Sequence, residues 1–168
     1  HLSEEHRVIL GIPNTLPKEM PIPGFSVISY TPQNLRQLAQ AADIVIVQGF
    51  LLETYPFLRK ETKCLVIDLY DPFLLESLEA HRKNPQQHQW QQHHLCLNAL
   101  IRQVLQADFI LCASERQKDY WLGFLSSLGR VNPSTYEQND FQHFLAVVPF
   151  GLPSDPPPPL EGNPLRVL

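Results

Sequence analysis

The chain has 168 residues and a formal net charge of −4, since 17 acidic side chains outnumber 13 basic ones. This length fits one ordinary domain, and the acidic balance argues against nucleic-acid binding, which needs a clustered basic surface. The longest apolar stretch, residues 41–52, contains Asp43 and Gln48 and is too short to span a bilayer.

The cysteines and the start of the sequence indicate a cytoplasmic protein. Cys64, Cys96 and Cys112 are an odd number without C-x-x-C spacing, which disfavours a disulfide scaffold or a zinc site and favours a reducing compartment. No basic segment followed by a hydrophobic one opens the chain, as it would in a signal peptide. We therefore expect a cytoplasmic location, with a peripheral membrane contact of the full-length protein left open.

The amino-terminal half alternates between apolar, β-prone runs and helical patterns. A helix is predicted to begin after the second run, because Thr31 is a typical N-cap and Pro32 fits the first helical position. Asp71 and Pro72 repeat this arrangement before a further helix over residues 73–78. The predicted strands in this half are residues 7–12, 25–30, 44–47 and 64–69.

A polar break separates the two halves. The glutamine- and histidine-rich residues 83–94 predict a surface loop or an irregular helix start, and an amphipathic helix follows over residues 95–105. The spacing of the nearby histidines does not match a zinc site, so we expect them to be solvated and expect no metal centre. These histidines are His81, His88, His93 and His94.

The last part of the chain predicts a strand, a capped helix and another strand. Residues 109–112 form the first apolar run, and Ser114 then begins a helix as N-cap, with Gln117 at capping-box spacing. Gly129 stands where a helix typically ends, and residues 147–149 predict the final strand.

Strands that alternate with helices predict an α/β, Rossmann-like fold: a mostly parallel sheet with helices on both faces. We assign this domain to residues 1–153. Residues 154–168 begin with a proline-rich tract, which predicts an extended linker leading to a further domain.

The carboxyl ends of parallel strands meet at one edge of the sheet, where ligands of such folds bind. The residues that follow the predicted strands should therefore line one crevice. These candidate site residues are Gln48, Gly49, Phe50, Asp68, Asp71, Ser114, Glu115, Arg116, Phe150 and Gly151.

Several of these residues have a structural alternative. A carboxylate at the end of a buried strand can accept a ligand hydroxyl or act as a base when burial raises its pKa. Asp71 can instead cap the helix that starts at Pro72, and Asp68 can be a structural acid bonded to backbone N–H groups. Ser114 is equally a helix cap, and Gly49 is either a turn glycine or a point of close approach for a ligand.

Four segments together resemble the N-terminal domain of a known enzyme family. They are VIVQGFLLETYPFL at 45–58, LVIDLYDPFLLESLEAH at 65–81, CASERQ at 112–117 and VPFGLP at 148–153. Their order and spacing resemble the retaining, family 4-like glycosyltransferases of GT-B fold. The resemblance extends over residues 6–153.

The resemblance implies one half of an enzyme that moves a sugar from a nucleotide-sugar donor to a sugar or glycolipid acceptor, with no cofactor. This half would form the acceptor-side wall of the cleft, with Asp71 near the reacting sugar, where many members have a histidine. A C-terminal domain would hold most of the donor. The present chain would be inactive alone.

The chain departs from this family at its front, where the usual first strand and glycine-rich loop before Arg7 are missing. We therefore expect an open sheet position beside residues 7–12 or 147–149, and a homodimer through that exposed edge is possible. The alternative function is a non-catalytic α/β interaction module that presents the proline tract. A dehydrogenase-type nucleotide domain is disfavoured because no G-x-G-x-x-G occurs.

Overall fold

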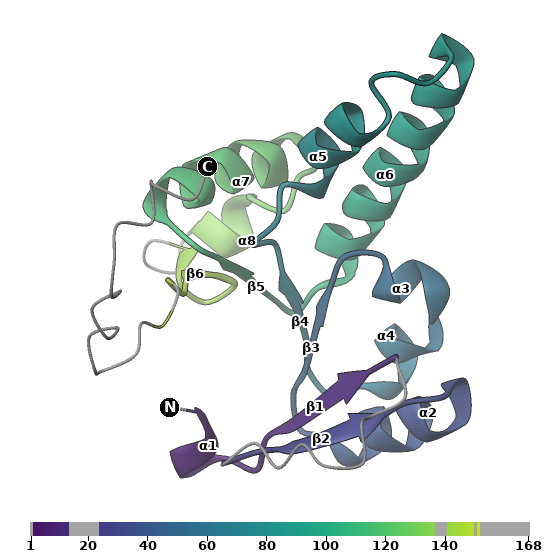
Figure 1. The fold of residues 1–168 in the computed structure, drawn as a ribbon. Coiled ribbons are helices and arrows are strands. Elements are labelled where there is room, and N and C mark those ends of the chain that lie inside the picture. The colour runs from purple at the N-terminus through teal and green to yellow at the C-terminus, as the bar shows by residue number, and fades with distance from the viewer. Residues whose placement is uncertain (1, 14–23, 137–140, 150, 152–168) are drawn as a thin grey trace, which may run out of the picture.

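The computed structural model of the chain describes residues 2–13, 24–136, 141–149 and 151 (Figure 1). Its strands are β1 (Ile9–Ile12), β2 (Ser26–Ser29), β3 (Val45–Gln48), β4 (Leu65–Asp68), β5 (Phe109–Cys112) and β6 (Leu145–Val147). Its helices are α1 (Leu2–Glu5), α2 (Pro32–Ala41), α3 (Leu51–Thr54), α4 (Phe57–Glu61), α5 (Phe73–Ala80), α6 (Gln86–Gln106), α7 (Glu115–Ser127) and α8 (Pro133–Tyr136). The first five predicted strands are confirmed with small differences at their ends, whereas the last one lies two residues earlier than predicted and shares only Val147 with residues 147–149.

The strands form two parallel sheets in the described part of the chain (Figure 1). One sheet has the order β3-β4-β5-β6, and the other contains only β1 and β2. From β2 onward the strands alternate with helices, so the α/β class with parallel sheets is confirmed, and it fits a Rossmann-like fold. In the described residues no ladder joins β1 to β3, so the β1 edge, beside which we expected an open sheet position, pairs only with β2.

The core lies around β4 and β5. Leu65 and Ile67 of β4 and Ile110 of β5 are completely buried, as is typical of parallel strands covered on both faces. Full burial of one such side chain contributes about 1.5–3 kcal/mol, so this core holds the ends of β4 and β5 in fixed positions. The helices add the buried side chains of Leu58, Leu100, Val104, Trp121 and Leu125.

Local sequence signals set the ends of α2 and α7. At the start of α2, the Thr31 side chain accepts a hydrogen bond from the backbone N–H of Asn34, while the Asn34 side chain accepts one from the N–H of Thr31. At the end of α7, Gly129 has a φ of +72°, and the N–H of Arg130 donates to the carbonyl of Leu125 at 2.9 Å. The predicted cap at Thr31 and helix end at Gly129 are confirmed.

The glutamine- and histidine-rich segment is helical from Gln86 onward, so of the two predicted alternatives the helix start is confirmed and the surface loop is wrong. Helix α6 begins at Gln86, immediately after Pro85, and continues without a break for 21 residues. Glutamine is a good helix former, and residues 86–94 contain no proline or glycine to stop the helix. The Gln89 side chain also donates to the carbonyls of Arg82 and Asn84, which ties the preceding turn to the helix.

Candidate functional site

The loops that follow β3 and β4 meet at the carboxyl edge of the four-stranded sheet, as predicted. Gln48 and Asp68 are register partners at the ends of β3 and β4. Gln48 Nε2 donates to Asp71 Oδ2 at 3.0 Å, and the rings of Phe50 and Phe73 lie edge to face with centroids 5.2 Å apart. One polar contact and one aromatic contact therefore hold the two loops together.

Asp71 does not cap a helix. Helix α5 begins at Phe73, after Pro72, and has no side-chain hydrogen bond at its N-cap. The Asp71 carboxylate accepts the hydrogen bond from Gln48 instead, while its backbone carbonyl accepts one from the N–H of Phe73. The capping interpretation of Asp71 is wrong, and its half-buried carboxylate belongs to the edge of the sheet.

Asp68 has the environment of a perturbed acid. It is half-buried at the end of β4, and its Oδ1 accepts a hydrogen bond from the N–H of Tyr70 at 3.0 Å. Burial raises the pKa of Asp68 and the negative charge of Asp71 raises it further, although the hydrogen bond from Tyr70 opposes the shift. The interpretation of Asp68 as an acid bonded to a backbone N–H is confirmed, and this does not exclude ligand contact.

The loop after β5 is joined to the loop after β4 by Gln117. Its Oε1 accepts a hydrogen bond from the N–H of Ala113 at 2.7 Å, and its Nε2 donates to the carbonyl of Tyr70 at 3.0 Å. Its own N–H donates to the Ser114 hydroxyl oxygen at 3.2 Å, so the predicted N-cap at Ser114 is confirmed. The sequence showed Gln117 only as a capping residue and gave no signal of its contact with Tyr70.

A second glutamine behind the site was also missed. Gln103 is only 1% exposed, and its Nε2 donates to the carbonyl of Gly49. The signal that could have found it is its place on the apolar face of α6, beside the buried Leu100 and Val104. Gly49 itself has a φ of +63°, which confirms it as a turn glycine, and the space that a Cβ would occupy there is open.

The remaining predicted residues lie outside this hydrogen-bonded cluster. Glu115 and Arg116 are exposed in the first turn of α7. Gly151 is exposed. Phe150 lies outside the described residues, as do residues 154–168 of the predicted linker.

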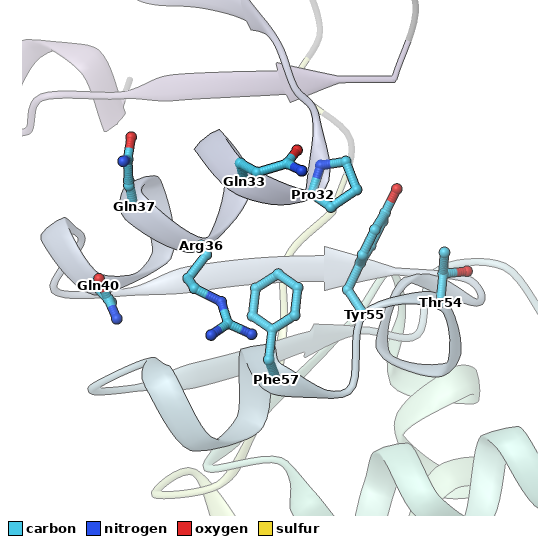
Figure 2. Close-up of a pocket in the computed structure, with 8 residues that line it drawn as sticks. All are labelled: Pro32, Gln33, Arg36, Gln37, Gln40, Thr54, Tyr55 and Phe57. Carbon is cyan, nitrogen blue, oxygen red and sulfur yellow. The ribbon is translucent and has the colours of Figure 1, made fainter.

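A hollow of about 770 Å³ lies along α2, away from the candidate site (Figure 2). Among the described residues, none of those predicted for the site lines it. The one charged side chain among its described lining residues is that of Arg36, which lies 4.6 Å above the Phe57 ring and pairs with Glu61 at 3.1 Å. Because this charge is already matched, we do not assign a charged ligand to the hollow. Its lining residues are Pro32, Gln33, Arg36, Gln37, Gln40, Thr54, Tyr55 and Phe57.

The described residues contain no group of three or more His, Cys, Asp and Glu side chains placed to hold a metal ion. His81 and His88 do lie close together, with ring centroids 5.3 Å apart. Among the described helices, none is long and apolar enough to cross a membrane. Comparison of the chain with protein-family models, with curated proteins and with solved structures gives no match.

Proposed function

We propose that this chain forms the acceptor-side half of a glycosyltransferase of GT-B type. The carboxyl edge of the four-stranded sheet binds a sugar or glycolipid acceptor, and a second domain holds most of the nucleotide-sugar donor. The observation that carries the proposal is the 3.0 Å hydrogen bond from Gln48 to Asp71, next to Asp68. This edge thus gathers carboxylate and amide groups, which form hydrogen bonds with hydroxyl-bearing ligands.

Asp71 is the residue that we assign to the reacting acceptor hydroxyl. A carboxylate offers about four lone-pair sites, so Asp71 can accept a hydroxyl in addition to the bond from Gln48. A hydroxyl that donates to Asp71 is held in one orientation and becomes a better nucleophile as its proton moves toward the carboxylate. Gln48 positions Asp71 for this contact.

Asp68 acts on Asp71 through charge. Because burial and Asp71 both raise the pKa of Asp68, lowering the pH removes the charge of Asp68 at a higher pH than that of an ordinary aspartate. In this proposal Asp71 contacts the acceptor, and Asp68 sets the charge beside it.

The rest of the reaction needs the second domain. In this arrangement the donor and acceptor meet when the two domains close, which excludes water from a donor that can be hydrolysed. The present chain supplies one wall of the cleft and the acceptor contacts. We therefore expect no sugar transfer from residues 1–168 alone.

The test is sugar transfer by the full-length gene product with a panel of UDP-, GDP- and ADP-sugars. Asp71→Asn keeps the size of the side chain and its bond to Gln48 but removes the charge, and we expect transfer to fall at least about tenfold, or about 1.4 kcal/mol in activation free energy. Asp119→Asn, at an exposed aspartate on α7, is the matched control and should leave the rate unchanged.

Two results would contradict the proposal in different ways. If the folded protein transfers no sugar from any donor, the glycosyltransferase function is wrong and the interaction module becomes the better interpretation. If transfer occurs but survives Asp71→Asn, the function stands and Asp71 has no part in the reaction.

A further inference from the structure

A groove separates the two sheets. Its walls are β1 and β3, and its floor is α2. None of the described side chains that line it carries a charge. Residues from these three elements include Ile9, Gly11, Leu38, Ala39, Val45 and Ile46.

Both walls present unused backbone groups to the groove. On β1, Val8 and Ile12 accept hydrogen bonds from β2 or its flank, so the backbone groups of the alternate residues Ile9 and Gly11 face away from β2. On β3, Val45 donates to Cys64 on the β4 side, so the groups of Ile46 face away from β4. In the described residues β1 pairs only with β2, and β3 only with β4 within its sheet.

The two strands that form the walls, β1 and β3, run in the same direction. Tyr30 follows the carboxyl end of β2, and its ring contacts the ring of Tyr55 with centroids 6.0 Å apart. Tyr55 lies just beyond α3, the helix that follows the carboxyl end of β3. Since β1 is parallel to β2, the carboxyl ends of β1 and β3 are on the same side, and one strand can be parallel to both.

The edge of β3 lacks the protection that natural edge strands usually have. Exposed edges are commonly blocked by charged residues, by proline or by a bulge. Here Ile44 and Ile46 are 59% and 50% exposed, in an uncharged run of β-branched residues that is typical of a strand with neighbours on both sides.

We infer that the groove is a docking site for one extended, uncharged peptide segment, which adds as a strand between β1 and β3. With this strand, the two-stranded and four-stranded sheets become one sheet. The uncharged walls select an uncharged segment. A folded second copy does not fit, because its own β1 and β3 are already paired on one side, whereas a strand in the groove needs both of its edges free. This inference does not depend on the proposed function.

The experiment uses the 168-residue chain and a labelled, end-capped heptapeptide of alternating valine and threonine. We expect saturable binding and at least tenfold slower amide exchange at Ile9, Gly11 and Ile46, with little change at Val45, whose N–H already bonds to Cys64. The same peptide with lysine at its centre should bind at least tenfold more weakly. Amide exchange is read by nuclear magnetic resonance.

Two variants locate the contact. Ile46→Lys places a charge in the groove at a half-exposed position, so the protein should stay folded while its peptide affinity falls at least tenfold. Val148→Lys changes a residue with 54% exposure just beyond β6, at the other end of the sheet, and should bind the peptide normally.

Three results would overturn the inference. The first is no peptide binding by the folded chain. The second is binding that Val148→Lys abolishes and Ile46→Lys does not, which would place the peptide beside β6. The third is slow exchange of the groove amides in the absence of peptide, to an extent that follows the fraction of dimer measured by sedimentation. That result would make a second copy of the chain the occupant.

Discussion

Gln117 is the residue whose removal should loosen the candidate site most directly. Gln117→Ala deletes two side-chain hydrogen bonds, one from the N–H of Ala113 at 2.7 Å and one to the carbonyl of Tyr70 at 3.0 Å. Each such bond contributes about 1 kcal/mol net, so the free energy of unfolding should fall by about 2 kcal/mol. Because the second bond joins the loops after β4 and β5, the loop that carries Asp71 should also become more mobile.

Urea denaturation measured by the fluorescence of the buried Trp121 gives the free energy of unfolding. Amide exchange over residues 69–73 reports on the loop, and it should become faster in Gln117→Ala. Arg116→Ala, at the exposed neighbouring position, is the control and should change stability by less than about 0.5 kcal/mol. If both variants lie within that limit, the two Gln117 bonds do not hold the loops together and our reasoning is refuted.

Three further substitutions test the fold and the electrostatics. Gly129→Ala, at a φ of +72°, should destabilise by about 1–2 kcal/mol in urea titrations. Leu58→Ala, at a fully buried position, should destabilise by about 2–5 kcal/mol, measured in the same way. Because the pKa of Asp68 is raised in the folded state, its ionisation opposes folding above that pKa, so Asp68→Asn should stabilise at pH 7. This gain should shrink as the pH falls toward the pKa of an unfolded aspartate; a gain that is constant with pH would contradict the assignment.

The strands could be predicted because their signal is local. Each is a short apolar run, and residues such as Thr31 and Gly129 mark the ends of the helices that connect them. The short helices α3 and α4 have too few residues for a periodic pattern, and they were missed. An open position beside residues 7–12 was expected, but its place between β1 and β3 was not predicted, because strand pairing depends on residues that are distant in the sequence.

The candidate site could be predicted only in outline. The topology of a parallel sheet places Gln48, Asp68 and Asp71 at one edge, and the structure confirms that they lie there. The use of each side chain could not be inferred, because helix caps and ligand-facing acids have the same sequence pattern. The buried amides of Gln103 and Gln117 could not be distinguished from solvent-exposed glutamines without the tertiary contacts that bury them.

The interruption of the sheet also has a consequence for cooperativity. The strands β1 and β2 share no ladder with β3 in the described residues, and side-chain contacts such as Tyr30 with Tyr55 and Arg36 with Glu61 join the surrounding segments. Opening of this small sheet therefore leaves the backbone hydrogen bonds of β3, β4, β5 and β6 intact. Such a region unfolds as a separate unit, and its free energy of unfolding is lower than that of the whole domain. The amino-terminal strands should thus visit an open state many times during the lifetime of the folded four-stranded sheet.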